Sequence, residues 1–192
     1  MAFSYARDKA LKKRSFIAGR FIAALEESLR SIREPVLYGD ERGFQGALLH
    51  EVNTRLGHGV LPSDPVIQQE YQKRIRHHGI KIRPDIIVHL PFERGVVEGR
   101  DEGNFVAIEL KRKATPKRAK QAFASLAQMK KVLKYPLTVF INVDSEQTHA
   151  ALCPKSIADQ TVCFAVCLRE GVPALKVEKS RIGVQKRKAR VE

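Results

Sequence analysis

The stretch Val106–Lys113, VAIELKRK, begins as an apolar run and ends in a cluster of charged side chains. Successive side chains of a β-strand point to opposite faces. In a strand over these residues, Glu109 and Lys111 share one face, and Ile108 and Leu110 share the other. The sequence therefore predicts a core strand that carries a carboxylate and an ammonium on the same face where it reaches the surface.

A second apolar run with a similar pattern lies upstream, in residues 82–90 (IRPDIIVHL). Asp85 opens this run and shares a strand face with Ile87 and His89. If the two runs pair as neighbouring strands, Asp85 lies beside Glu109. An aspartate, a glutamate and a lysine are then expected to converge at the ends of adjacent strands.

The remaining apolar patterns predict one α/β domain over residues 1–179, with a central mixed β-sheet and helices on its faces. The basic segment 180–192 is expected to be a flexible tail. The predicted order is α-α-β-β-β-α-β followed by a hairpin. Helices are expected over residues 5–33, 40–56 and 116–133, and strands over residues 66–72, 82–90, 104–113, 136–143, 161–168 and 174–179.

The charge balance indicates the kind of partner. Lysine and arginine number 35 against 21 aspartate and glutamate residues, which gives a formal net charge of +14. A strongly basic chain gains affinity for polyanions, because each neutralised phosphate releases counterions. DNA is the expected partner. The sequence contains no apolar run near the ~18 residues that a membrane span requires, so a cytoplasmic protein without a membrane partner is expected.

Two carboxylates and a lysine at one strand end suit metal-dependent hydrolysis of a phosphodiester. Carboxylates bind hard cations such as Mg²⁺, which prefer oxygen ligands. A bound ion stabilises charge on phosphate and lowers the pKa of a bound water. A nearby ammonium can orient that water. The backbone carbonyl of Leu110, between Glu109 and Lys111, is a candidate third oxygen ligand.

Asp85 within RPD (residues 83–85), followed by IELK (residues 108–111), resembles the signature of the PD-(D/E)XK nuclease superfamily. The similarity covers about residues 38–145. It implies a restriction-endonuclease-like core and a Mg²⁺-dependent DNA endonuclease, with Mn²⁺ as a possible substitute. It also implies that Asp85 and Glu109 bind the metal and that Lys111 assists the attacking water.

Many members of this superfamily add an acidic residue from the helix that precedes the first core strand. Here the candidates are Glu41 and Glu51, in DERGFQGALLHEVNTRL (residues 40–56). Glu41 falls in line with the apolar stripe of that helix and is the favoured candidate, whereas Glu51 lies toward the flank of the stripe. An acid in the first turn also suits the helix dipole, so Glu41 has a structural reading as well.

The basic run KRKATPKRAK (residues 111–120) leads from the candidate lysine into the next helix. Such a run can follow a phosphodiester backbone. The candidate contacts are Lys113, Lys117, Arg118 and Lys120.

Two other readings stay open from the sequence. One is a nucleic-acid-binding protein that keeps these charges without catalysis, and the other is a subunit of a larger nucleoprotein complex. The short chain also favours a homodimer for an enzyme that cuts both strands, because two sites are then needed.

Overall fold

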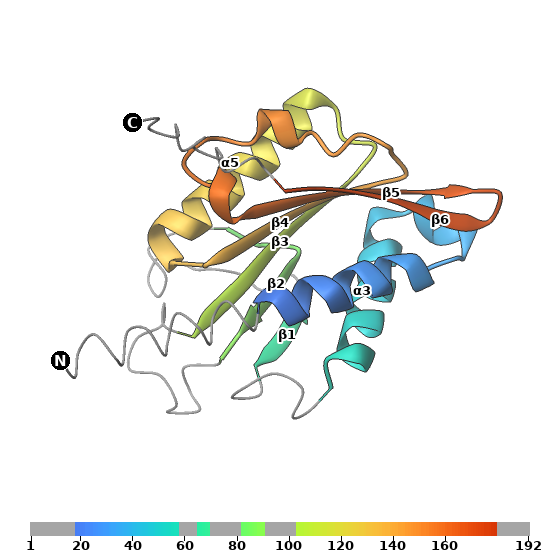
Figure 1. Ribbon diagram of the computed structural model, residues 1–192, viewed down its shortest axis with the longest axis horizontal. Helices are drawn as coiled ribbons and strands as arrows, with labels where there is room; N and C mark the ends of the chain where they lie inside the picture. Colours follow the sequence, from blue (N-terminus) through green and yellow to red (C-terminus); the bar gives the residue numbers. More distant parts are fainter. Residues whose placement is uncertain (1–17, 58–64, 70–81, 91–102, 180–192) are drawn as a thin grey trace, which may run out of the picture.

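A computed structural model describes residues 18–57, 65–69, 82–90 and 103–179 of the chain. Six strands in these residues form one sheet whose spatial order follows the sequence order (Figure 1). The parallel pairs are β3–β4 and β4–β5, and the other neighbouring strands pair antiparallel. The strands are β1 (Val66–Gln69), β2 (Ile86–His89), β3 (Asn104–Arg112), β4 (Leu137–Val143), β5 (Thr161–Arg169) and β6 (Val172–Lys179).

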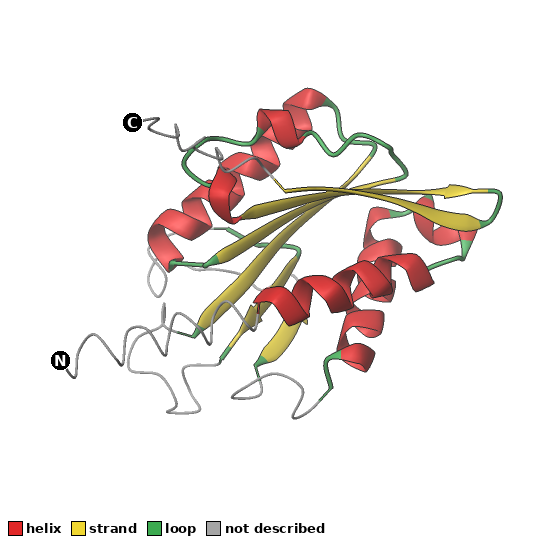
Figure 2. Ribbon diagram, viewed as in Figure 1, coloured by secondary structure: helices red, strands yellow, loops and turns green. Residues whose placement is uncertain are grey.

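Helices cover both faces of the sheet (Figure 2). One face carries a helix over residues 18–31, α2 (Pro35–Tyr38) and α3 (Glu41–Arg55). The other face carries α5 (Pro116–Leu133), which crosses from β3 to β4. Two short 3₁₀ helices, Ala150–Leu152 and Ala158–Gln160, lie between β4 and β5. None of the described helices is long and apolar enough to cross a membrane.

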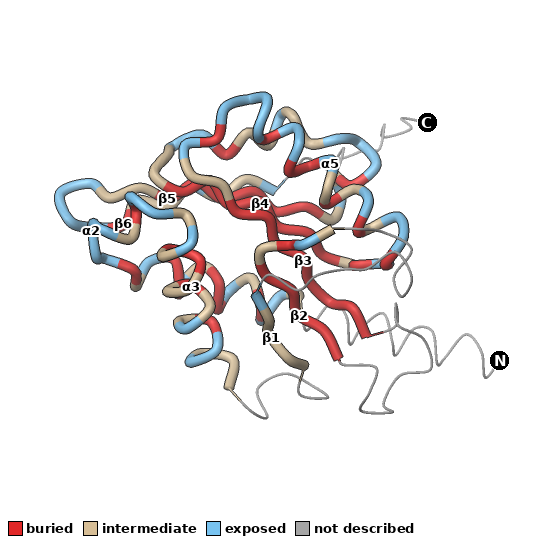
Figure 3. Tube along the Cα trace, turned by 180° about the vertical axis from the view of Figure 1, so that it is seen from behind, coloured by how far each residue is buried: buried red, intermediate tan, exposed pale blue. Residues whose placement is uncertain are grey.

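The core lies on both sides of β3, and Figure 3 shows β3 and β4 buried along most of their length. Ile108 and Leu110 face one apolar cluster, together with Phe21 of the N-terminal helix. Ala107 faces the other cluster, under α5. A strand covered on both faces reads as a continuous apolar run. Only the end of such a strand reaches the surface, and Lys111 and Arg112 lie at that end of β3.

Two polar caps fix where the helices next to the end of β3 begin. The Asp40 side chain accepts hydrogen bonds from the backbone N–H groups of Arg42 and Gly43 and thereby starts α3. Thr115 Oγ1 accepts from the backbone N–H of Arg118 and starts α5, whose first residue is Pro116. Both are preferred N-cap arrangements. They place the first turns of α3 and α5 beside the strand that carries Glu109 and Lys111.

The predicted α/β class, with a mixed sheet between helices, is confirmed. The described strands and the two long helices agree with the sequence patterns within a few residues. The short helix α2 was not predicted: the sequence patterns indicated one helix over residues 5–33 and no other before residue 40, whereas Pro35 occupies the first turn of a separate helix. Residues 5–17, 70–72 and the tail 180–192 lie outside the described residues.

Candidate active site

The hairpin of β2 and β3 brings Asp85 to Glu109. Ile86 pairs with Ile108 across the two antiparallel strands, so the position before Ile86 faces the position after Ile108. Asp85 Oδ2 accepts a hydrogen bond from the backbone N–H of Leu110 at 2.6 Å. The Asp85 carboxylate is thereby fixed against the end of β3.

The ammonium group of Lys111 lies among the three carboxylates of this region. Its Nζ is 3.2 Å from Asp85 Oδ2, 3.4 Å from Glu41 Oε1 and 3.6 Å from Glu109 Oε2. It also donates a hydrogen bond to the carbonyl oxygen of Leu110. Four oxygen atoms from three separate segments therefore converge on one cation.

Burial governs the electrostatics of this cluster, which we call the Lys111 cluster (Glu41, Asp85, Glu109 and Lys111). Burial and the neighbouring charge of Asp85 raise the pKa of Glu109 to about 8. Burial also raises the pKa of Asp85, although Lys111 and the Leu110 N–H oppose it. Burial lowers the pKa of Lys111, but the three carboxylates outweigh this effect and the pKa is raised. Lys111 is therefore charged at neutral pH, whereas Glu109 holds a proton for much of the time.

Glu41 joins α3 to the end of β3 and to the start of α5. One of its oxygens faces Lys111, and the other accepts from the backbone N–H of Arg112 at 2.8 Å. The second oxygen is also 3.2 Å from Arg118 Nη2. Its place in the first turn of α3, after the Asp40 cap, aims it at the strand end.

The structure places Glu51 away from this cluster. Its Oε2 accepts from Ser31 Oγ at 2.7 Å and pairs with Arg55 one helical turn further on. These two partners lower the pKa of Glu51. Of the two helix carboxylates that the sequence proposed, only Glu41 faces Lys111, because Glu51 is three turns further along α3.

Gln45 is part of the site's framework and was not recognised from the sequence. Its side chain is 4% exposed, and its Nε2 donates to the backbone carbonyl of Asp85 at 2.6 Å. The signal was a polar residue one turn after Glu41, next to Phe44 and one turn before Leu48, in the apolar stripe of α3. A buried amide in such a stripe indicates a specific partner.

We expect Gln45→Leu to lower the free energy of unfolding by about 1–3 kcal/mol, because it leaves the Asp85 carbonyl without its donor. Gln45→Glu keeps the size of the side chain but places an acceptor against the carbonyl, so it should lower the free energy of unfolding at least as much. Urea unfolding of the purified variants measures the difference. A loss below about 0.5 kcal/mol for Gln45→Leu would show that this hydrogen bond does not hold Asp85.

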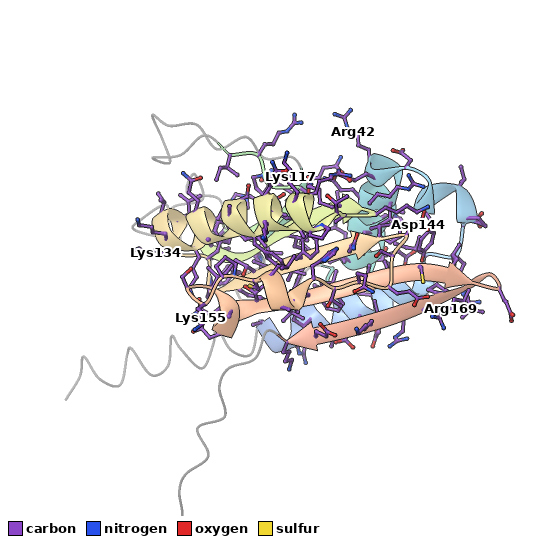
Figure 4. All side chains as sticks on the ribbon, turned by 90° about the horizontal axis from the view of Figure 1, so that it is seen from above. Arg42, Lys117, Lys134, Asp144, Lys155 and Arg169 are labelled. Carbon is purple, nitrogen blue, oxygen red and sulfur yellow. The ribbon has the colours of Figure 1, made fainter. Side chains whose placement is uncertain are left out.

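The candidate phosphate contacts lie directly after the end of β3 and in the first turns of α5. Lys113 and Arg112 both pair with Asp144, which follows β4. Arg118 contacts Glu41 and donates to the Arg112 carbonyl. Lys117 and Lys120 are exposed on α5. Figure 4 shows Lys117 near the start of α5 and Lys134 at its other end.

The donor atoms around Lys111 suit a hard divalent cation, because they are carboxylate and carbonyl oxygens. The distances from Lys111 Nζ to the carboxylate oxygens, 3.2, 3.4 and 3.6 Å, are those of ion pairs with an ammonium group. Among the described residues, no group of three or more His, Cys, Asp or Glu side chains is close enough to hold a metal ion. The oxygen donors are of the type that Mg²⁺ prefers, but in this structure their spacing is that of an ion-pair cluster around Lys111.

The fold and the cluster define an α/β protein with a carboxylate–lysine site at the ends of neighbouring strands. No protein-family model matches the sequence, and no curated protein or solved structure matches it either. The resemblance to the PD-(D/E)XK superfamily therefore stays a prediction from the residues.

Proposed function

We propose that this protein is a Mg²⁺-dependent DNA endonuclease of the restriction-endonuclease-like class. The observation that carries the proposal is the convergence of Asp85, Glu109 and Glu41, with the Leu110 carbonyl, on Lys111 Nζ. Carboxylates at the ends of adjacent strands can hold a metal ion, and a lysine that stays charged beside them can stabilise developing negative charge in phosphodiester hydrolysis. The net charge of +14 supports a polyanionic substrate.

Each residue of the Lys111 cluster has a role in this proposal. Asp85, Glu109 and the Leu110 carbonyl would hold the ion, which when bound stabilises charge on the phosphate and acidifies a water. Lys111 positions that water by donating a hydrogen bond and offsets developing negative charge. Glu41 holds Lys111 and the Arg112 backbone in place. Gln45 fixes the backbone that carries Asp85.

The proposal is tested by incubating the full-length protein with duplex, branched and single-stranded DNA in the presence of Mg²⁺ or Mn²⁺. We expect cleavage of at least one of these substrates and none when EDTA is present. Asp85→Asn, prepared in parallel, controls for contaminating nucleases. Cleavage that is equal in the wild type and in Asp85→Asn would contradict the assignment.

A second candidate function is nucleic-acid binding without catalysis, alone or within a larger complex. It is favoured by one observation: Lys111 occupies the point where the carboxylates converge, and it neutralises them without an ion. This reading predicts salt-dependent DNA binding with no cleavage by the wild type under any metal condition. It also predicts that Asp85→Asn binds DNA as the wild type does.

Both candidates use the exposed side of α5, so replacing Lys117 and Lys120 by glutamine should weaken DNA binding. Each lost phosphate contact makes the slope of log affinity against log salt concentration less steep by about 0.9. The slope of the double variant should therefore be less steep than that of the wild type by about 2. Fluorescence anisotropy with a labelled duplex over a salt series measures it. Lys131→Gln and Lys134→Gln, at the other end of α5, are the matched control. An unchanged slope in Lys117→Gln/Lys120→Gln would place the DNA elsewhere.

A further inference from the structure

The strand β6 forms one edge of the sheet. Its inner side pairs with β5, and no other described strand pairs with its outer side. The hairpin of β5 and β6 extends beyond α5 (Figure 1). An edge strand presents backbone groups that can pair with another strand, and proteins control this with charges, prolines or a specific partner.

The turn of the hairpin determines which backbone groups of β6 point outward. Arg169 pairs with Val172, and the two residues between them, Glu170 and Gly171, have φ of 51° and 76°. Two positive φ values in a two-residue loop define a type I′ turn, in which Arg169 and Val172 are hydrogen-bonded to each other. Hydrogen-bonded and non-hydrogen-bonded pairs then alternate along the strands.

By this alternation, Val172, Ala174, Lys176 and Glu178 direct their backbone groups to β5. The backbone groups of Leu175, Val177 and Lys179 point outward. Pro173 agrees with this assignment, because its position needs no N–H toward β5 and a proline in an edge strand occupies such a position. From Leu175 to Lys179 the outer edge of β6 therefore offers three complete donor–acceptor residues.

The side chains on this edge are complementary to themselves. Lys176 and Glu178 lie on the same face of β6 and pair within the strand at 2.8 Å, and Glu178 also accepts a hydrogen bond from Thr148 Oγ1. Their side chains are 55% and 38% exposed. On the opposite face, Leu175 and Val177 pack against the core. Val177 therefore lies between a positive residue, Lys176, and a negative residue, Glu178.

We propose that a second copy of this chain pairs with the outer edge of β6, antiparallel, about a two-fold axis at Val177. In this register Val177 faces Val177 of the partner subunit and their backbones are hydrogen-bonded. Leu175 faces the partner's Lys179, which adds further backbone hydrogen bonds. Lys176 faces the partner's Glu178, and Glu178 faces the partner's Lys176. The two protomers then share one continuous sheet of twelve strands, six from each.

The charges select this register over its neighbours. An axis at Lys176 places two lysines directly opposite each other, and an axis at Glu178 places two glutamates opposite each other. Like charges directly across a strand pair are destabilising, whereas opposite charges stabilise it. An axis at Leu175 brings Pro173 into the new ladder, where its missing N–H removes a hydrogen bond. The interface is isologous, as a two-fold dimer requires.

Exchange of the two charges tests the register. Lys176→Glu places two acidic residues in each strand, and Glu178→Lys places two basic residues in each strand. Each variant alone should be monomeric at concentrations where the wild type is dimeric, and an equimolar mixture of the two should form the heterodimer. Light scattering coupled to size exclusion, with one variant carrying a mass tag, measures all three. Circular dichroism melting confirms that each variant is folded.

Val177→Pro gives an independent test, because it removes an outward N–H and none of the N–H groups that β6 directs to β5. We expect this variant to be monomeric. Three outcomes would overturn the proposal: a wild type that is monomeric at all concentrations, a dimer that persists in Lys176→Glu, or single-charge variants that do not recover when mixed. The dimer does not depend on cleavage activity, so these results stand apart from the test of the proposed function.

Discussion

Asp85→Asn should reduce Mg²⁺-dependent DNA cleavage by at least about 10³-fold, because the ion supplies several kcal/mol of charge stabilisation. Asparagine has the same size, and its oxygen can still accept from the Leu110 N–H, which Asp85 Oδ2 now binds at 2.6 Å. The change therefore removes a negative charge and leaves the backbone contact. Single-turnover cleavage of the preferred substrate, with enzyme in excess, measures the chemical step.

Asp144→Asn is the matched control for this experiment. Asp144 is also a carboxylate at a strand end, but it pairs with Arg112 and Lys113 and makes no contact with Lys111 among the described interactions. We expect its cleavage rate to change by less than about 10-fold. If both variants lose activity equally, the loss reflects the charge balance of the whole strand end, and Asp85 has no separate role.

Lys111→Met should destabilise the protein in metal-free buffer by about 2–3 kcal/mol at alkaline pH. Removing one partner of a largely buried charge cluster leaves the other charges without compensation. Lys111 is 20% exposed and faces Asp85 and Glu109, whose side chains are 19% and 8% exposed. Methionine keeps most of the aliphatic stem, so the loss reports the ammonium. Urea unfolding in the presence of EDTA measures it.

The size of this loss should depend on pH in a defined direction. The pKa of Glu109 is raised to about 8 in the folded protein, and removing Lys111 takes away an interaction that lowers it. The folded state then keeps a proton that the unfolded state releases above its ordinary pKa. Stability therefore falls as pH rises between the two values, so the effect of Lys111→Met is smaller at about pH 5 than at about pH 9.

Two further variants make this prediction specific. Lys113→Met removes a lysine whose side chain is 60% exposed and should change stability by less than about 0.5 kcal/mol. Adding Glu109→Gln to Lys111→Met should restore part of the loss at high pH. A loss from Lys111→Met that is the same at both pH values would contradict the role of Lys111 as counter-ion. The same variant should lose about 10²-fold in cleavage if Lys111 positions the water.

Most of the fold could be predicted because its strands have clear patterns. The run that ends in Glu109 and Lys111 is apolar on both faces, which a strand covered by helices requires. Strand alternation correctly placed Glu109 and Lys111 on one face of the sheet, with Asp85 beside Glu109 at the end of the neighbouring strand. These are local rules of strand geometry, and the pairing of β2 with β3 satisfies them.

The sequence favoured Glu41 over Glu51 from its alignment with the apolar stripe, but the contact itself depends on how that helix packs. The structure shows that the first turn of α3, fixed by the Asp40 cap, approaches the end of β3. Gln45 was missed for the same reason, since its partner is a backbone atom forty residues away in the sequence. The separate helix α2 was missed because a proline can end one helix or start another.

Glu41 has one further consequence, for the time at which the site forms. Its contacts with Lys111, Arg112 and Arg118 span 70, 71 and 77 residues of sequence. Such distant contacts close large loops and form after local helices and hairpins. During synthesis, Glu41 cannot make all of these contacts until Arg118, at the start of α5, has left the ribosome. Under the proposed function, a nascent or partly folded chain carries the charges of the Lys111 cluster without assembling them, so it would not cleave nucleic acid before folding is complete.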